Sequence, residues 1–406
     1  MPSPISVLAR NRDYRRLLFA ELVVFGADWF VMVPLLVLLL DLTGSGLYGG
    51  LVLAVDTGLI ALLLPYTGTV ADRVDRRRLL VASNLAAIVG VLLLFGVRGP
   101  HGPGVALLAV GAVAVAKAFY SPAASAALPN LVEPADLAVA NTISGSAWGT
   151  MAVVGASLGG VASAAFGPYT CFGISAVSLV AAAALAWRIR RPTQASRDAG
   201  RPPQKTWPAL AESLRYLGRN PRVLALVTVK SAVGLGNGVL TAFPLFAALF
   251  GVGTVGTGLL FALRGAGALL GPLLTRRVLA RRSFLLPGLA ISMSLYGLAY
   301  LGVSVARWFP LALALVFVAH LAGGTNWVIS NFALQVTVPD ELRGRVFATD
   351  MMLATLAISV SQLVVGALVD AVDARVLIAG SGATTLLYAL GWRLATRRTA
   401  LAQDAP

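Results

Sequence analysis

The sequence has 406 residues, of which 58% are hydrophobic and only 12% are charged, and its mean hydropathy is +0.82. An average soluble domain carries roughly 25% charged residues, so this composition excludes an ordinary soluble enzyme and indicates an integral membrane protein. The net charge of +15 does not indicate nucleic-acid binding, because the basic residues lie in short segments between apolar runs. One cysteine and two histidines provide neither a disulfide framework nor a pattern of metal ligands.

Apolar runs long enough to cross a bilayer follow one another along the whole chain. The runs of the first half are 17–40, 47–67, 79–97, 104–125, 138–165 and 169–187. Those of the second half are 223–249, 255–275, 284–304, 309–331, 346–369 and 375–394. Backbone N–H and C=O groups in lipid must bond within their own segment, so each run predicts a helix. We therefore expect an all-α membrane protein with twelve transmembrane helices in two six-helix bundles.

The longest polar segment, residues 188–222, separates the sixth run from the seventh. Its Pro202-Pro203 dipeptide is typical of a linker, and a short surface helix is expected before Asn220. The predicted division is an N-terminal bundle at 1–190, a cytoplasmic linker at 191–220 and a C-terminal bundle at 221–406. This division leaves no room for a nucleotide-hydrolysing domain, and we expect no enzymatic activity.

The charges of the loops predict the orientation. With both termini in the cytoplasm, nearly all of the 32 basic residues fall in cytoplasmic segments, and only Arg98, Arg307 and Arg375 fall in outer loops. Basic residues are strongly enriched on the cytoplasmic side of membrane proteins. We therefore expect a multi-pass protein of the cell membrane with both termini inside. The composition, rich in arginine, alanine and glycine, indicates a bacterial source.

Six charged residues fall inside the predicted spans. They are Glu21, Asp28, Asp56, Lys117, Lys230 and Arg264. On insertion scales a charge at the bilayer centre costs roughly 2.5–3.5 kcal/mol, so these side chains must face the interior, a wet cavity or each other. Three acids and three bases suggest mutual pairing, which either locks the two halves together or lets an acid carry a proton.

The second alternative makes Asp28, Glu21 and Asp56 candidate proton carriers. A carboxyl group binds a proton more tightly when it loses water and releases it beside a base, so a change of surroundings can load and unload it. Asp28 is the first choice, because it is predicted nearest to mid-membrane.

The two halves of the sequence show an internal repeat, with a shift of about 208 residues. The aligned pairs are Asp56 with Arg264, Glu21 with Lys230, and Asp28 with Asn237. Carriers built from two parallel repeats bind substrate between the halves near mid-membrane. Glu21 and Lys230 are therefore a candidate contact across that interface.

The segment that follows the second run reads GTVADRVDRR. It resembles the signature loop of the major facilitator superfamily, G-x-x-x-D-R-x-x-R-R, and the resemblance implies a cytoplasmic gate. Gly68 allows close helix packing, and Asp72 can cap a neighbouring helix. The arginines Arg73, Arg76 and Arg77 can pair with acids.

Other segments resemble the drug–proton antiporter branch of this superfamily, which includes macrolide and enterobactin exporters. They are Gly26-Ala27-Asp28-Trp29-Phe30, Leu42-Thr43-Gly44-Ser45, Ser121-Pro122-Ala123, Leu128-Pro129 and Leu342-Arg343-Gly344-Arg345-Val346. The resemblance covers nearly the whole chain. It implies alternating access and proton-driven export of an amphipathic drug, natural product or siderophore.

The fifth predicted helix departs from the family pattern. Its antiporter motif, G-x-x-x-G-P-x-x-G-G, is represented by Gly155, Gly159 and Gly160. Met151 replaces the first glycine and Ala156 replaces the proline. The remaining glycines still allow a neighbouring helix to approach closely. This weakened motif keeps uptake or facilitated diffusion open beside export, and a non-transporting membrane sensor is a third alternative.

The candidate substrate cavity draws on both halves. Its predicted residues are Trp29, Lys117, Lys230, Asn237, Arg264 and His320. Lys117 lies about two turns after the position of an arginine that is common in the fourth helix of related antiporters. His320, in the tenth run, has either a structural hydrogen bond or a role with substrate or proton. We expect a monomer whose partners are a small-molecule substrate, protons and membrane lipid, with no cofactor or metal and with a proton gradient as energy source.

Overall fold

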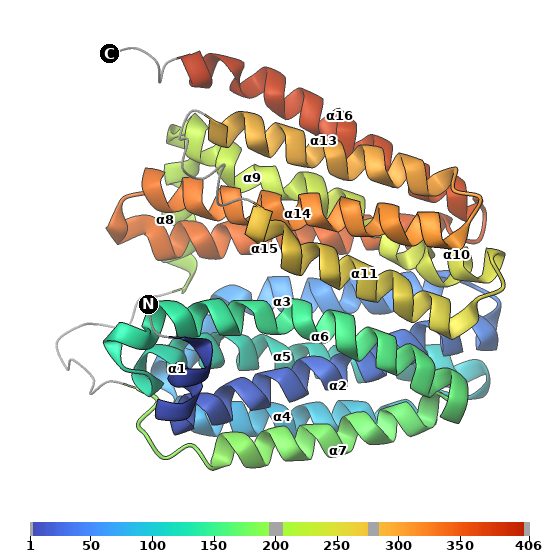
Figure 1. The fold of residues 1–406 in the computed structure, drawn as a ribbon, viewed down its shortest axis with the longest axis horizontal. Helices are drawn as coiled ribbons and strands as arrows, with labels where there is room; N and C mark the ends of the chain where they lie inside the picture. Colours follow the sequence, from blue (N-terminus) through green and yellow to red (C-terminus); the bar gives the residue numbers. More distant parts are fainter. Residues whose placement is uncertain (1–2, 195–205, 275–283, 402–406) are drawn as a thin grey trace.

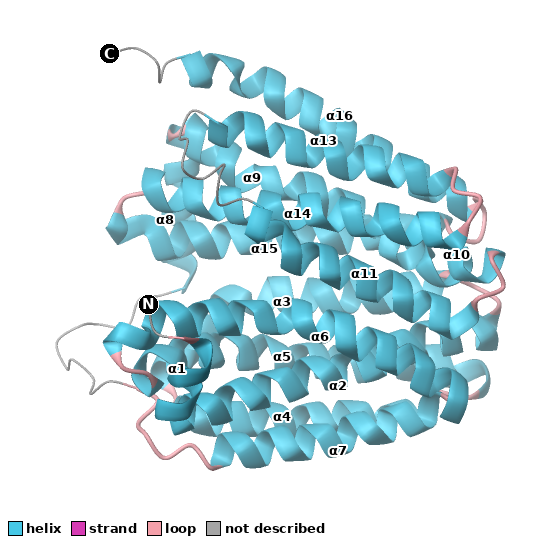
Figure 2. Ribbon diagram, viewed as in Figure 1, coloured by secondary structure: helices cyan, strands magenta, loops and turns pink. Residues whose placement is uncertain are grey.

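The computed structural model describes residues 3–194, 206–274 and 284–401. Within these ranges every regular element is a helix and none is a strand (Figure 2). The N-terminal half contains α1 (Pro4–Arg10), α2 (Arg12–Thr43), α3 (Leu47–Arg73), α4 (Arg76–Leu93), α5 (Gly102–Leu131), α6 (Leu137–Phe166) and α7 (Pro168–Trp187). The remainder contains α8 (Thr206–Arg219), α9 (Pro221–Gly236), α10 (Phe243–Leu249), α11 (Gly253–Leu274), α13 (Leu285–Ser304), α14 (Phe309–Thr337), α15 (Asp340–Leu368) and α16 (Ala374–Leu401). In this part of the chain 12 helical stretches are long and apolar enough to span a membrane, which confirms the predicted spans.

The helices form two bundles, one above the other in Figure 1. Helices α2–α7 pack on one another in the first bundle, and α9–α16 pack on one another in the second. Each bundle has its own apolar core, formed by residues such as Leu17 and Phe172 in the first and Leu226 and Met293 in the second. The expected all-α fold with two six-helix bundles is therefore confirmed. The surface helix expected before Asn220 is present as α8, whereas linker residues 195–205 lie outside the described ranges.

The two bundles meet along two helix pairs, α3 with α15 and α6 with α11. Glycines allow both close approaches. A Cβ atom added to Gly50 would lie 2.6 Å from the Cα atom of Gly366, and one added to Gly160 would lie 3.1 Å from the Cα atom of Gly258. Backbones this close are typical of membrane helices that pack through small residues.

Hydrogen bonds connect the predicted outer parts of α3 and α15. The hydroxyl of Ser45 donates to the carboxylate of Asp370, and the backbone N–H of Gly46 donates to the same carboxylate at 2.7 Å. Deeper in the interface, the hydroxyl of Thr57 donates to the side-chain oxygen of Gln362 at 2.8 Å. These bonds join the two bundles along the α3–α15 contact, from its predicted outer end inward.

The seventh span is one apolar run in the sequence but is not one regular helix. Between α9 and α10 the chain forms a 3₁₀ segment, η4 (Asn237–Ala242). The Asn237 amide donates to the carbonyl of Val233 at 2.7 Å, and glycine precedes and follows it. Asparagine and glycine are poor helix formers, and Gly238 packs so tightly that an added Cβ would lie 2.5 Å from the carbonyl oxygen of Ser361. The span predicted over 223–249 is therefore present, but it contains this 3₁₀ segment, which the apolar run did not reveal.

The signature-loop residues join α3 to α4. Gly68 lies on α3 with no heavy atom within 4 Å of an added Cβ, so the expected close packing at this glycine is not present. Asp72 belongs to the last turn of α3, but its side chain lies outside the described part of the structure. The N-terminus of α4 is capped by Asp75, whose carboxylate accepts a bond from the N–H of Arg78 at 2.8 Å.

The arginines of this segment connect it to neighbouring helix ends. Arg73 is exposed at the end of α3. The guanidinium of Arg76 donates to the carbonyls of Ala126 at 2.8 Å and Thr193 at 3.1 Å. Arg77 donates to the carbonyl of Ile189 at 3.1 Å. For Arg77 the partner is thus a backbone carbonyl, where the sequence predicted an acid.

Candidate proton and substrate site

One lysine and two aspartates meet inside the N-terminal bundle. Lys117 comes from α5, Asp28 from α2 and Asp56 from α3. The Nζ atom of Lys117 lies 2.6 Å from Oδ2 of Asp28 and 3.1 Å from Oδ1 of Asp56. Three of the six predicted intramembrane charges therefore pair with one another, and they do so within one half of the protein. We call these three residues the N-half triad.

The N-half triad is partly accessible and carries an unbalanced charge. The side chains of Lys117, Asp28 and Asp56 are 19%, 30% and 13% exposed, so they border open space. Helices α5 and α3 approach closely near Gly111, which lies against the side chains of Leu59 and Val55. With all three groups ionised the net charge is −1, and one added proton makes it neutral.

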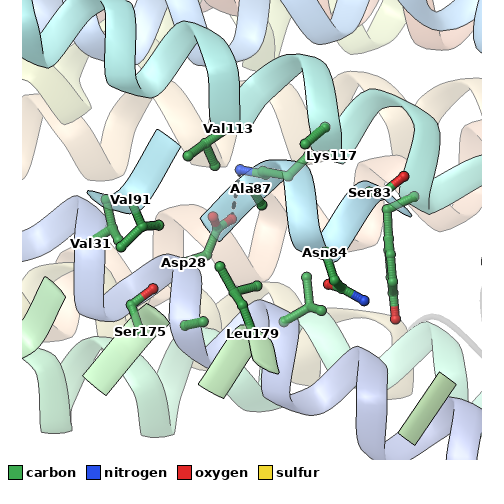
Figure 3. Close-up of a pocket in the computed structure, with 14 residues that line it drawn as sticks. Asp28, Val31, Ser83, Asn84, Ala87, Val91, Val113, Lys117, Ser175 and Leu179 are labelled. Carbon is green, nitrogen blue, oxygen red and sulfur yellow. Dashed lines mark ion pairs between the residues drawn. The ribbon is translucent and has the colours of Figure 1, made fainter. Parts of the chain in front are cut away.

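A small cavity of about 20 Å³ lies beside Asp28 and Lys117 (Figure 3). Asn84 of α4 and Ser175 of α7 contribute polar groups to its lining, as does Tyr120 of α5. The hydroxyls of Tyr120 and Ser175 are buried and have no hydrogen-bond partner among the described residues. A cavity of this size can hold one water molecule among these polar groups.

Glu21 lies elsewhere in the same bundle. Its carboxylate accepts a hydrogen bond from the hydroxyl of Ser144 on α6 at 3.3 Å. The hydroxyl of Tyr14 lies 3.3 Å from that of Ser144 and donates to the carbonyl of Ala140 at 2.9 Å. Glu21 is buried and forms no ion pair with a described residue, so it stays a second candidate for proton binding.

The expected contact between Glu21 and Lys230 is wrong. Lys230 of α9 forms an ion pair with Asp350 of α15 and donates to the side-chain oxygen of Asn331 at 2.7 Å. Its Nζ atom also lies 4.9 Å from the ring centroid of Trp327. Both partners of the ion pair are fully buried in the C-terminal bundle. Asp350 is absent from the predicted set of charges, although it lies inside the eleventh apolar run and meets the same criterion.

Arg264 of α11 meets an aromatic cluster that joins the two bundles. Its guanidinium lies 5.1 Å from the ring centroid of Trp148 on α6. The ring of Trp29 lies 6.5 Å from that of Trp148 and 5.5 Å from that of Phe261 on α11. We call Trp29, Trp148, Phe261 and Arg264 the interfacial cluster.

The interfacial cluster contains a charge without an acidic partner. No carboxylate of the described residues forms an ion pair with Arg264, and its buried Nε atom has no hydrogen-bond partner there. Trp148 is 38% exposed, so one face of the cluster is open. This open face presents an aromatic ring beside a cation, two groups that attract apolar rings and hydrogen-bond acceptors respectively. Trp148 was not predicted, because an uncharged aromatic residue in an apolar run gives no signal that separates it from packing.

Two other predicted cavity residues are buried in the C-terminal bundle. His320 of α14 shares a hydrogen bond of 2.7 Å between its Nε2 atom and the hydroxyl of Tyr300 on α13. This contact agrees with the structural alternative for His320. Asn237 starts η4, and its side-chain oxygen is buried with no hydrogen-bond partner among the described residues.

The glycines of the fifth-helix motif lie on α6 between the two halves. Gly155 and Gly159 face α2, where added Cβ atoms would lie 3.1 Å from the Cβ atom and 2.9 Å from the carbonyl oxygen of Trp29. Gly160 faces α11 instead, against Gly258. The motif therefore lets α6 pack tightly on both sides and fixes the position of Trp29.

Within the described ranges, no three histidine, cysteine, aspartate or glutamate side chains come together in a way that could hold a metal ion. The notable chemistry is instead the N-half triad, the buried Lys230–Asp350 pair and the interfacial cluster between them.

Comparison with known sequences decides the family. The sequence profile of the Major Facilitator Superfamily matches residues 17–349, which is most of the chain. The chain belongs to the Major Facilitator Superfamily. It is a multi-pass membrane transporter of that superfamily, and its relatives include bacterial proteins.

Among relatives in the superfamily, the multidrug efflux pump Tap of Mycolicibacterium fortuitum is 26% identical over 372 residues, which cover 87% of this chain and 88% of Tap. An uncharacterised MFS-type transporter of Mycobacterium tuberculosis is 28% identical over 331 residues, covering 76% of this chain and 73% of the relative. The uncharacterised transporter YfiS of Bacillus subtilis is 26% identical over 306 residues, covering 73% and 72%.

Solved structures of the superfamily share the fold. A bacterial homologue of the human lysosomal transporter Spinster, in an inward-facing and unoccupied conformation, has a TM-score of 0.73 at 15% identity, covering 97% of this chain and 99% of the other. The peptide transporter PepTSo gives a TM-score of 0.73 at 13% identity, with coverage of 97% and 99%. At such low identity these likenesses concern the fold alone.

Proposed function

We propose that this transporter exports an amphipathic small molecule from a bacterial cell in exchange for protons. The observation that carries the proposal is the N-half triad, in which two acids share one base inside a membrane-spanning bundle. The relation to a multidrug efflux pump over most of both chains supports export as the direction and an amphipathic compound as the substrate.

Asp28 is the proposed proton carrier of the triad. It lines the small cavity next to Lys117, whereas Asp56 does not. A charge transferred into a region of low dielectric is destabilised, so closing the site favours the neutral, singly protonated triad. Opening the site to water on the other side favours release, because water stabilises the ionised carboxylate.

The proposed substrate site is the interfacial cluster. Asp28 and Trp29 are neighbours on α2, but successive residues of a helix point in different directions. Asp28 faces α5 within the bundle, while Trp29 faces α6 and α11 at the interface. A movement of α2 that follows proton binding at Asp28 therefore moves Trp29. This shared helix gives a physical link between proton and substrate.

The proposed cycle alternates which end of the interface is closed. With both termini in the cytoplasm, as the loop charges predict, the bond of Asp370 holds the outer ends of α3 and α15 together, and the bond of Gln362 joins them deeper in the membrane. Release of substrate to the outside requires these bonds to break. We propose that a single chain, acting as a monomer in the cell membrane, carries out the cycle.

The test uses inverted membrane vesicles, a panel of fluorescent amphipathic dyes that are cationic, neutral or anionic, and an acidic vesicle interior. Export predicts that at least one dye accumulates inside and that protons leave as it enters. Asp28→Asn should abolish accumulation against a gradient while dye binding to the purified protein remains. Asp41→Asn, on the exposed outer end of the same helix, is the matched control and should transport normally.

Three results would contradict parts of the proposal. Accumulation only in right-side-out vesicles would show uptake, the alternative that the weakened fifth-helix motif leaves open. Transport with no proton response would reject proton coupling. Unchanged uphill transport by Asp28→Asn would remove Asp28 as the carrier.

A further inference from the structure

A basic cavity lies at one end of the N-terminal bundle, away from the triad and the interfacial cluster. It has a volume of about 570 Å³ and is lined by Arg16, Arg77, Trp187, Arg188 and Arg190. These residues come from the start of α2, the start of α4 and the end of α7, so three helix ends meet around it. On the orientation given by the loop charges, this end faces the cytoplasmic leaflet. We call these five residues the basic cavity.

Two of its arginines are held in place by backbone carbonyls. Arg16 donates to the carbonyl of Arg188 at 2.7 Å, and Arg77 donates to the carbonyl of Ile189 at 3.1 Å. Both carbonyls follow the last residue of α7, where backbone acceptors lack helical partners. Arg77 is further fixed by its position 5.2 Å from the ring centroid of Trp187. The side chains of Arg16 and Arg77 are therefore preorganised in the absence of a ligand.

The other two arginines have free guanidinium groups. No described residue forms an ion pair with the side chain of Arg188 or Arg190. Asp13 lies beside these residues, where its carboxylate accepts a hydrogen bond from Arg16 at 2.6 Å and others from the backbone N–H groups of Arg190 and Arg191. One acid against four arginines leaves a net charge of +3 around the cavity. Such a concentration of unpaired donors fits an anionic group with several oxygen acceptors.

The position of Trp187 indicates that this anion belongs to the membrane. Its ring is 61% exposed at the end of a membrane-spanning helix. Tryptophan in this position lies at the level of lipid headgroups, and basic pockets between helices on the cytoplasmic side bind phosphate-bearing headgroups. We propose that the basic cavity binds the headgroup of an anionic phospholipid of the cytoplasmic leaflet, with Arg188 and Arg190 contacting the phosphate and Trp187 packing beside the glycerol and acyl chains.

The site is tested with the full-length protein in detergent. Native mass spectrometry and lipid-induced thermal stabilisation are measured with dioleoyl phosphatidylglycerol and, for comparison, dioleoyl phosphatidylcholine. The double variant Arg188→Gln/Arg190→Gln should bind phosphatidylglycerol roughly 30-fold more weakly, because two basic contacts are lost. Neither guanidinium has an ion-pair partner among residues 3–194, 206–274 and 284–401, so we expect the variant to fold. The matched control is Arg12→Gln/Arg15→Gln, which removes two exposed arginines at the start of α2 that do not line the cavity.

Selective weakening in the first double variant supports the site, provided that phosphatidylcholine binds more weakly than phosphatidylglycerol to the unchanged protein. Equal weakening in both double variants would overturn it, because general surface charge would then explain binding. Inorganic phosphate is the third arm. If it stabilises the protein as strongly as phosphatidylglycerol at equal concentration, the cavity is a site for a free anion and the lipid assignment fails. All these measurements are of binding, so they are independent of whether the transporter exports.

Discussion

The Nζ atom of Lys117 lies 2.6 Å from the Oδ2 atom of Asp28, and both residues belong to the same half of the transporter. This ion pair therefore does not lock the two halves together. The two halves can move relative to each other while the pair persists, so the proposed proton carrier is separate from the contacts between the bundles. The separation makes the role of each residue testable.

Removal of the base should damage the protein more than removal of one acid. Lys117→Gln leaves the two carboxyl groups of Asp28 and Asp56 beside each other without their shared counter-charge, and we expect the free energy of unfolding to fall by about 3 kcal/mol. Lys117→Gln/Asp28→Asn keeps one carboxylate and should recover part of this loss. Thermal unfolding in detergent, followed by tryptophan fluorescence, measures both. Strictly additive losses would show that the three groups do not interact.

The Lys230–Asp350 pair should behave as a structural contact. Lys230→Met leaves Asp350 buried without its partner and should lower the free energy of unfolding by about 3–5 kcal/mol. Lys230→Met/Asp350→Leu removes both charges and should regain most of that stability, as a double-mutant cycle of unfolding measurements will show. The charge exchange Glu21→Lys/Lys230→Glu serves as control and should give no rescue, since these residues do not touch. Rescue by that exchange would contradict the structure.

Trp148 should matter for substrate more than for folding. Its ring is partly exposed and stacks with the Arg264 guanidinium, so Trp148→Ala should raise the half-saturating substrate concentration about fivefold with little loss of stability. Trp308→Ala, at an exposed site before α14, is the control. The assay is the initial rate of dye transport in vesicles. An unchanged half-saturating concentration would place the substrate elsewhere.

Gly50 should control the closed outer end. A Cβ on this residue would lie 2.6 Å from the Cα atom of Gly366, so Gly50→Ala should push α3 and α15 apart. A cysteine at Gln362 should then be labelled from outside roughly tenfold faster, since overpacking typically costs about 1–3 kcal/mol in the closed state. Gly104→Ala has open space around its Cβ and should leave the labelling rate unchanged. Equal rates in both variants would mean that this contact does not hold the outer end shut.

The orientation is tested by cysteine labelling in intact cells. The native Cys171 is buried, so the background reaction should be small. His101→Cys should react with an impermeant reagent from outside, whereas Arg215→Cys on α8 should react only after the cells are opened. The reverse pattern would overturn the loop-charge assignment, and with it the cytoplasmic placement of the basic cavity.

The sequence alone predicted the spans well, because a helix that crosses the lipid needs an uninterrupted run of apolar residues, and such a run is visible in the sequence. It did not predict which charges meet. The repeat aligned Glu21 with Lys230, but each side chain points into its own bundle. Glu21 accepts a hydrogen bond from Ser144, and Lys230 forms an ion pair with Asp350. Aligned positions in a repeat share a place within each half, and they need not face each other across the interface.

The 3₁₀ segment of the seventh span and the aromatic contacts of the interfacial cluster could not be predicted from hydropathy either, because both depend on tertiary packing. Asn237 and its flanking glycines lie in a 3₁₀ segment where Gly238 packs closely against α15, and hydropathy carries no information about such packing. In the sequence Trp148 cannot be distinguished from other apolar residues, and its contact with Arg264 is seen only in the folded structure.

The charge count of the N-half triad has an electrical consequence. If the proton is carried there, the step from −1 to neutral limits the transporter to one proton per turnover at this site. Export of a neutral substrate then moves one positive charge inward and is electrogenic, while export of a monovalent cation in exchange for that proton moves no net charge. The membrane voltage adds about 2.3 kcal/mol per 100 mV in the first case and nothing in the second. Neutral compounds are thus the ones whose export should fail first when the voltage collapses.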